Sequence, residues 1–281
     1  MTPAIAGLVL LAALLHASWN AMAKSGGSPQ FSIASYRLVS ALVCLPLLFY
    51  FPIPLAESWP MLLASTAIHT AYYVTLARSY RAGDLSQVYP LFRGLAPVLV
   101  TLGAAGLAGE YLGLGAMLGI GLVSLGLMSI TFAGGALGRI PPLALRWGLA
   151  TSVLIAAYTV ADGMGVRLAG NPFSYIIWLF VLEPIPIGLW LLFRDRAGWG
   201  AYLRAKPGKI CLGALAAGAA YAMVIYAMGV APMALVSSLR ETSVIFAALI
   251  GSLMFREPFG RQRIIAAVLV CVGVGIIKLL G

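Results

Sequence analysis

The stretch Tyr89-Pro-Leu-Phe-Arg93 places an arginine inside a long apolar segment, and this charge guides the interpretation of the rest of the chain. A second arginine, Arg240, lies in a later apolar segment and is followed directly by Glu241. Each arginine precedes a glutamate by seventeen residues, Glu110 in the first case and Glu257 in the second. The shared spacing indicates that the chain consists of two related halves.

The composition is that of a membrane protein. Of the 281 residues, 62% are hydrophobic and 9% are charged, whereas soluble domains carry about 25% charged residues. We therefore interpret the net charge of +10 as basic loops that face lipid headgroups, and not as a nucleic-acid interface. The cysteines stand singly in apolar runs, without the CxxC spacing that would indicate a metal site or a disulfide framework.

Turn-forming residues divide the chain into apolar segments of membrane-spanning length. A helix needs about 20 apolar residues to cross the hydrocarbon core, and the chain holds ten such segments. The predicted spans are 3–23, 32–51, 60–80, 86–108, 112–133, 146–167, 173–193, 208–228, 233–255 and 260–280. No Lys or Arg precedes Lys24, so we expect the first segment to be a retained membrane helix and not a signal peptide.

Internal similarity predicts an all-α membrane protein of ten transmembrane helices in two inverted five-helix repeats, residues 1–138 and 139–281. A shift of 147 positions superposes both Arg–Glu pairs and also lays Gly126 on Gly273. Because five is an odd number, the second copy enters the membrane from the opposite face, and such repeats place substrate near the midplane. Basic residues gather at helix ends on the side away from the termini, so the positive-inside rule predicts external termini.

Five charged residues are expected inside the spans: Arg93, Asp162, Glu183, Arg240 and Glu241. Each charge at a membrane helix centre costs about 2.5–3.5 kcal/mol on insertion scales, so these groups should face the bundle interior. Arg93, with Tyr89 one turn before it, and Arg240 are candidates for an anion clamp, because guanidinium groups bind carboxylate or phosphate bidentately. The alternative is that Arg93 pairs with Glu241 and joins the two halves.

Two further polar clusters are candidate substrate contacts. The first consists of His69, Tyr72 and Tyr73 on the third predicted helix and Tyr221 on the eighth. The second consists of His16, Trp19 and Asn20 on the first helix, with Tyr158 and Asp162 on the sixth. Either these side chains form interhelical hydrogen bonds, or they line a cavity. In the second case Glu241, Asp162 or His16 would meet a proton or a substrate amine.

Other polar and small residues favour structural roles. Glu110 and Glu257 lie at breaks between helices, where we expect solvated carboxylates near the start of the following helix. Glu183 is either a partner at a helix kink or a proton carrier. Gly115 and Gly119 have the small-xxx-small spacing of closely packed helices, within one molecule or in a dimer.

The motif search indicates no enzyme, cofactor or metal. The sequence has no HExxH, no GxSxG and no Walker loop, so neither hydrolysis nor ATP-driven transport is indicated.

With these features, the chain resembles the drug/metabolite transporter superfamily, in its EamA-type branch. The resemblance covers nearly all residues and rests on three features. They are the inverted ten-helix repeat, the glutamate before the last helix of each half, and the opening His16-Ala-Ser-Trp-Asn20. It implies a secondary transporter of the cell inner (plasma) membrane that alternates access around a cavity lined by helices 1, 3, 4, 6, 8 and 9.

The resemblance extends to particular relatives. The plastid sugar-phosphate transporters of this superfamily bind phosphate through residues similar in type and helix to His69, Arg93, Tyr221 and Arg240. Glu241 stands where those transporters have a second basic residue, which suggests a ligand that also carries an amine. The opening motif is similar to that of EamA-type proteins encoded near phosphonate-use genes, and the Tyr-rich faces are similar to those of aromatic amino acid exporters.

The sequence therefore predicts a secondary transporter of a small anionic or zwitterionic metabolite, such as a phosphonate, an organophosphate or an amino acid. One alternative is an exporter of aromatic amino acids, drugs or other amphiphilic metabolites. Another is a non-transporting membrane scaffold or an intramembrane enzyme. The expected partners are the substrate, the lipid bilayer and a coupled proton or exchanged metabolite, for a monomer or homodimer.

Overall fold

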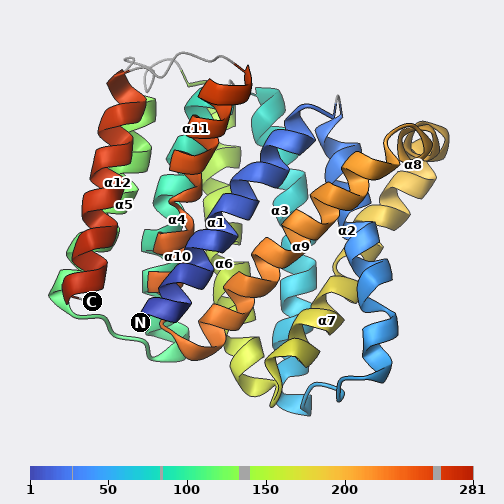
Figure 1. The fold of residues 1–281 in the computed structure, drawn as a ribbon, viewed down its shortest axis with the longest axis horizontal. Helices are drawn as coiled ribbons and strands as arrows, with labels where there is room; N and C mark the ends of the chain where they lie inside the picture. Colours follow the sequence, from blue (N-terminus) through green and yellow to red (C-terminus); the bar gives the residue numbers. More distant parts are fainter. Residues whose placement is uncertain (27, 83–84, 133–139, 256–260, 281) are drawn as a thin grey trace.

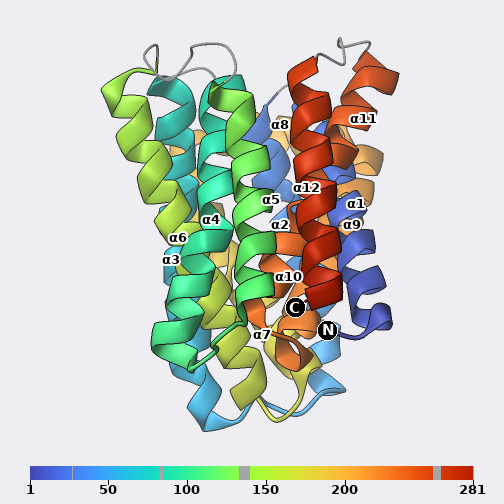
Figure 2. The same ribbon diagram turned by 90° about the vertical axis from the view of Figure 1, so that its left-hand side faces the viewer.

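The computed structural model describes residues 1–26, 28–82, 85–132, 140–255 and 261–280. Over these residues the chain is a bundle of helices without β-strands (Figure 1). Both chain termini lie toward the same end of the bundle, which we call the terminal end (Figure 2). The predicted fold class, an all-α membrane protein, is confirmed.

The helices follow the predicted spans closely. The elements are α1 (Pro3–Lys24), α2 (Pro29–Cys44), η1 (Pro46–Phe49), η2 (Ala56–Ser58), α3 (Trp59–Ala82), α4 (Leu85–Ala108), α5 (Leu114–Phe132), α6 (Pro142–Leu168), α7 (Pro172–Leu182), α8 (Pro184–Ala205), α9 (Pro207–Val230), α10 (Met233–Arg240), α11 (Ser243–Phe255) and α12 (Arg261–Leu280). Eight stretches of the described chain are both long and apolar enough to cross a membrane. The third span, α3, is long enough but more polar, and the apolar part of α12 is shorter.

Local sequence explains where the helices begin. Proline occupies the first turn of α1, α2, α6, α7, α8 and α9, where its missing N–H costs nothing. Side-chain oxygens of Thr2, Ser28 and Asn171 accept hydrogen bonds from first-turn amides. These caps satisfy amides that have no partner within the helix.

Two predicted spans are broken and not continuous. The predicted helix 173–193 is divided at Glu183 into α7 and α8, because Pro184 removes a backbone donor at that point. The predicted helix 233–255 is divided at Glu241 and Thr242 into α10 and α11. With each broken pair taken as one segment, the described helices form ten segments at the positions of the ten predicted spans.

The packing of the helices follows the inverted repeat. Helix α1 begins at the terminal end, whereas its counterpart α6 begins at the opposite end (Figure 2). Helix α3 packs on α6, and the matching helix α9 packs on α1. In the same way, α4 packs on α6, while α10 and α11 pack on α1. The first helix of each repeat therefore packs against helices of the other repeat.

Glycines allow α5 and α12 to pack closely against each other. A Cβ on Gly119 would lie 2.7 Å from the carbonyl oxygen of Gly273, and one on Gly115 would lie 2.4 Å from Cβ of Leu280. Both distances are shorter than a real Cβ tolerates. The small-xxx-small pattern therefore serves packing within the molecule.

Candidate functional site

The break in the ninth span places charged residues in the middle of the bundle. Helix α10 ends at Arg240, and the amides of Glu241 and Thr242 donate to carbonyls three residues earlier, Ser238 and Leu239. This tight turn redirects the chain before α11 begins at Ser243. Discontinuous helices at membrane depth occur where the backbone is buried in protein or lines a cavity.

Arg93, Glu241 and Arg240 form one buried ion cluster across the two repeats. Nε of Arg93 on α4 lies 2.9 Å from Oε2 of Glu241, and Nε of Arg240 lies 3.9 Å from Oε1 of the same carboxylate. All three side chains are at most 5% exposed. Two guanidinium groups share one carboxylate, so the cluster carries an excess of one positive charge.

Arg240 is the less satisfied member of this cluster. Its Nε and Nη2 are buried and have no hydrogen-bond partner in the described chain, and its ion-pair contact with Glu241 is long. Buried charged donors normally find partners, because their desolvation is costly. The unsatisfied donors make this guanidinium suited to an oxyanion.

Aromatic rings from three helices pack around His69, which is buried on α3. The His69 ring stacks on Tyr158 of α6 with a centroid distance of 4.1 Å, and it meets the edge of Tyr221 of α9 at 5.7 Å. Tyr72 adds an edge contact to Tyr158 at 5.6 Å. Nδ1 of His69 lies 2.9 Å from the carbonyl oxygen of Ser65. The predicted first cluster therefore also includes Tyr158, which sequence analysis placed with the first helix.

Asp162 is enclosed by tyrosines. Its carboxylate accepts hydrogen bonds from the hydroxyls of Tyr175, at 3.0 Å, and Tyr221. The Asp162 side chain is 0% exposed. Sequence analysis did not include Tyr175, which lies on α7 among apolar residues and had no charged neighbour to mark it.

A third arginine was missed by the sequence analysis. Nη1 of Arg37 on α2 lies 3.1 Å from Oε2 of Glu183, whose Oε1 accepts a 2.7 Å hydrogen bond from the hydroxyl of Tyr73. The Arg37 guanidinium also lies over the ring of Tyr221, 5.8 Å from its centroid. Arg37 falls within the predicted span 32–51, so a charge count over every span would have found it.

Comparisons with known proteins agree with this architecture. The model of the EamA-like transporter family matches residues 4–132 and again residues 142–279. The chain belongs to the EamA-like transporter family. A solved crystal structure, titled only as that of a protein, superposes with a TM-score of 0.79 at 18% identity, covering 100% of this chain and 98% of the other. No curated protein matches the chain.

Membership makes this EamA-like protein a multi-pass membrane transporter of the drug/metabolite transporter type. The two matched ranges correspond to the two repeats, and the boundary predicted between residues 138 and 139 lies outside the described residues. The family is one of transporters and not of enzymes.

The remaining predicted site residues of this EamA-like transporter lie on α1 and α4. The Asn20 amide donates to the carbonyl oxygen of His16 on its own helix, at 2.8 Å, and His16 meets the edge of Trp19 at 5.2 Å. Trp19 packs on Tyr36, away from the Asp162 cluster with which sequence analysis had grouped it. The side chain of Tyr89 lies outside the described part of the structure.

Glu110 differs from the solvated carboxylate expected at a helix end. Oε1 of Glu110 lies 2.5 Å from Nη2 of Arg167, and Oε2 accepts a 2.9 Å hydrogen bond from the amide of Met233. Glu110 therefore caps α10 and not α5, the helix that follows Glu110 in the chain. Arg167 in turn donates to the carbonyls of Met228 and Ala231. This set of contacts, here called the Glu110–Arg167 latch, joins the two repeats at the terminal end, whereas Glu257 lies outside the described residues.

Proposed function

We propose that the protein is a secondary transporter that moves a small metabolite with an acidic group by alternating access. In this proposal Arg240 binds the acidic group directly, and Arg93 holds Glu241 and adds positive charge. The observation that carries the proposal is the buried Arg93–Glu241–Arg240 cluster, in which Arg240 keeps unsatisfied donors. An anion that accepts from Arg240 would satisfy these donors and neutralise the excess charge.

Asp162 supports a zwitterionic substrate. Its carboxylate is held by two neutral tyrosine hydroxyls, whereas Glu183 is already paired with Arg37. Tyr158 packs on His69 and on Tyr221, and the Tyr221 hydroxyl donates to Asp162. A substrate with an acid at Arg240 and an amine toward Asp162 would match this distribution of charge, as amino acids and aminophosphonates do.

The broken ninth span and the inverted repeat support alternating access. Transporters built from inverted repeats bind substrate between the repeats, next to discontinuous helices, and expose the site by moving one bundle against the other. The helices that carry Arg93, Arg240, His69, Tyr158 and Tyr221 are α3, α4, α6, α9 and α10. These helices come from both repeats, as such a mechanism requires.

Counterflow in proteoliposomes tests the proposal. Purified protein is reconstituted and loaded with unlabelled amino acids, phosphate esters or phosphonates, and entry of the labelled compound is measured. We expect counterflow with at least one compound that carries an acid, and a weaker signal with its neutral amide. Saturable counterflow of the amide equal to that of the acid would contradict an anion site.

Two arginine variants separate a binding role from a structural one. Charge-assisted hydrogen bonds contribute about 1.5–3 kcal/mol, so Arg240→Gln should raise the KM by about tenfold or more. Because the Arg93–Glu241 pair remains in Arg240→Gln, the melting temperature of this variant should change little. Arg93→Gln should also lower the melting temperature, because it leaves Glu241 buried with one distant partner. Arg81→Gln, an exposed charge at the end of α3, is the matched control.

Arg240→Gln with an unchanged KM would remove Arg240 from the substrate site. Lysine is a poorer replacement, because it keeps the charge.

The aromatic cluster favours a second candidate, an exporter of aromatic amino acids. Four pairs of rings in this cluster have centroid distances of 4.1–6.2 Å: His69–Tyr158, His69–Tyr221, Tyr72–Tyr158 and Tyr158–Tyr221. Aromatic pairs contribute about 0.5–1.5 kcal/mol beyond their buried area. Counterflow of tryptophan, tyrosine and phenylalanine in preference to alanine and phosphonates would support this candidate, and a preference for aliphatic acids would contradict it.

A further inference from the structure

A groove on the outside of the bundle is separate from the charged core. It has a volume of about 770 Å³, within the range of about 300–1,000 Å³ that small-molecule sites occupy. One wall is α2, with Leu38 and Ala41, and the other is formed by α7 and α8, with Val181, Ile185, Leu189 and Leu192. None of these residues belongs to the proposed transport site.

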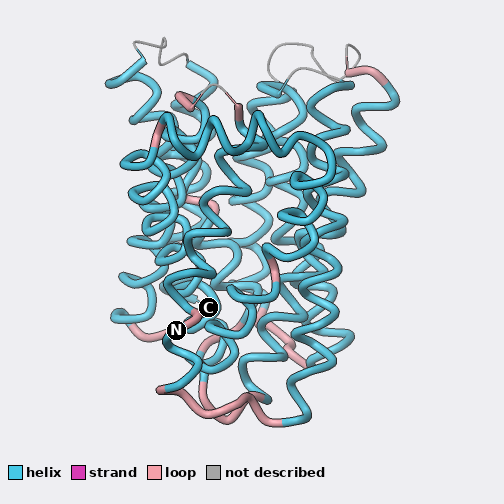
Figure 3. Tube along the Cα trace, turned by 90° about the vertical axis from the view of Figure 1, so that its right-hand side faces the viewer, coloured by secondary structure: helices cyan, strands magenta, loops and turns pink. Residues whose placement is uncertain are grey.

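The second half of α8 lines one end of the groove because the helix turns sharply at Asp195. Asp195 has non-helical backbone angles, φ −153° and ψ 59°, and its carboxylate accepts a 2.9 Å hydrogen bond from the amide of Gly198. Asp195 therefore acts as a cap that starts a second helical segment. This segment is seen end-on in Figure 1 and runs across the bundle in Figure 3.

Two hydrogen bonds fix this segment over α2. The indole N–H of Trp199 donates to Oγ of Ser35 at 2.9 Å, and the hydroxyl of Tyr202 lies 2.8 Å from Oγ of Ser32. Trp199 is only 4% exposed and lines the groove. The groove therefore lies between α2 and a segment of α8 that these two hydrogen bonds hold in place.

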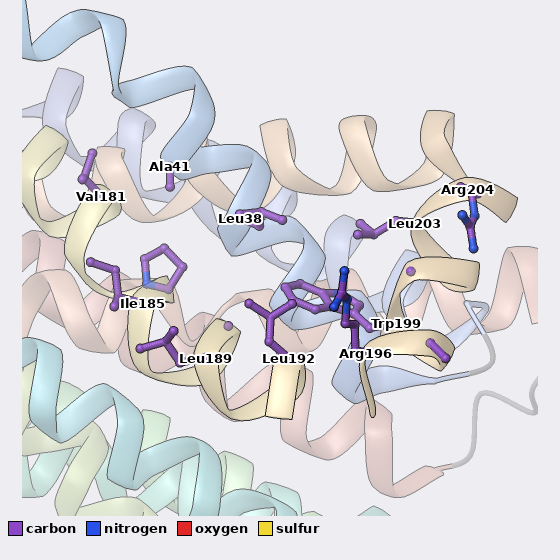
Figure 4. Close-up of a pocket in the computed structure, with 14 residues that line it drawn as sticks. Leu38, Ala41, Val181, Ile185, Leu189, Leu192, Arg196, Trp199, Leu203 and Arg204 are labelled. Carbon is purple, nitrogen blue, oxygen red and sulfur yellow. The ribbon is translucent and has the colours of Figure 1, made fainter. Parts of the chain in front are cut away.

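The charge along the groove is polarised. Figure 4 shows Val181, Ala41 and Ile185 at one end and Arg196 and Arg204 toward the other. Arg196 and Arg204 are exposed, and over the described chain neither forms a hydrogen bond or an ion pair. The neighbouring Asp195 carboxylate is directed to Gly198. An apolar channel with two available guanidinium groups at its surface end matches the two parts of a phospholipid.

We propose that this groove binds one anionic phospholipid, with an acyl chain along α7 and α8 and its phosphate at Arg196 and Arg204. Basic pockets between membrane helices bind anionic headgroups, and such lipids gather in the cytoplasmic leaflet. The arginine end of the groove, on α8, lies toward the end of the bundle away from the termini (Figure 1). The positive-inside rule predicts this end to be cytoplasmic. The lipid would hold the turned segment of α8 against α2 and α7.

Native mass spectrometry of the purified full chain tests this proposal. The protein is delipidated in mild detergent and mixed with equal amounts of phosphatidylglycerol and phosphatidylcholine. We expect retained phosphatidylglycerol on the wild-type protein and about tenfold less on Arg196→Gln/Arg204→Gln, because each basic residue adds to the attraction. The control Arg194→Gln/Lys209→Gln removes the same charge from exposed residues at the same end that do not line the groove.

A third variant separates the groove from surface charge. Gly188 lies beside the groove, and a Cβ there would be 3.9 Å from Trp199, an ordinary contact that folding tolerates. Gly188→Leu should lower lipid retention with every charge in place. Equal retention by the two double variants, or equal binding of the two lipids to the wild-type protein, would overturn the proposal. Full retention by Gly188→Leu would overturn the acyl-chain site.

Discussion

At the scale of the residue, Arg93 and Arg240 are not equivalent despite their matching positions in the repeat. Glu241 follows Arg240 directly, and the turn after α10 directs its carboxylate toward Arg93, at 2.9 Å. Arg93 therefore has the short ion pair and Arg240 the long one. The geometry agrees with the second interpretation of Arg93, its pairing with Glu241, and leaves Arg240 as the arginine of the pair that is available for an anion.

Asp162 is the residue whose substitution best distinguishes an amine partner from a proton carrier. If Asp162 meets a substrate amine, Asp162→Asn should raise the KM for an amino acid more than for the corresponding acid without the amine. If it carries a coupled proton, counterflow should persist while accumulation driven by a pH gradient is lost. Both are measured in proteoliposomes.

Tyr175→Phe is the matched control for Asp162→Asn, because it removes one hydrogen bond to Asp162 and keeps the carboxylate. Unchanged counterflow and unchanged accumulation in Asp162→Asn would assign Asp162 a purely structural role.

At the scale of the element, the Glu110–Arg167 latch connects the end of α6, the start of α10 and the loop after α4. Exposed or partly exposed ion pairs contribute about 0–1 kcal/mol. Glu110→Gln should therefore shift the equilibrium between closed and open forms of the terminal end by up to about fivefold. The expected result is faster maleimide labelling of a Ser237→Cys reporter from that side. Ser237 lies on α10 and is fully buried in this conformation.

Glu57→Gln is the control for the latch, because Glu57 is an exposed acid at the same end of the bundle. Labelling at the same rate in Glu110→Gln and Glu57→Gln would show that the latch does not hold the terminal end closed.

The contact between α5 and α12 makes a second prediction at this scale. A Cβ on Gly119 would lie 2.6 Å from Cγ1 of Ile277, and overpacking of this kind costs about 1–3 kcal/mol. Gly119→Ala should therefore lower the melting temperature in detergent. Gly121→Ala, two residues away, meets no heavy atom within 4 Å and should leave the melting temperature unchanged or raise it. Equal melting temperatures would contradict the tight packing.

At the scale of the whole molecule, the inverted repeat places both termini and the latch at one end, and the turned segment of α8 at the other. The positive-inside rule predicts that the terminal end is external. In a background without the native cysteines, Glu57→Cys should react with an impermeant maleimide in intact cells, and Ala205→Cys only after permeabilisation. Both positions are exposed. The reverse pattern would invert the predicted topology.

The repeats are also interleaved, which sequence similarity does not reveal. Helix α6 packs with α3 and α4 of the first repeat, whereas α1 packs with α9, α10 and α11 of the second. The two matched ranges, residues 4–132 and 142–279, are therefore a duplication and not two separate bodies. Movement of one bundle against the other would involve helices from both repeats.

The sequence by itself determined the membrane class, the number of spans and the inverted repeat, because apolar length, turn residues and repeated spacing are properties of the chain alone. It also identified Arg93, Arg240 and Asp162, since a charge inside an apolar segment is visible without a structure. Only the tertiary structure decided the partners: Glu241 for Arg93, Tyr221 for Asp162, and Arg167 for Glu110. These partners lie on different helices, and their distances depend on packing angles and helix breaks that no spacing along the chain records.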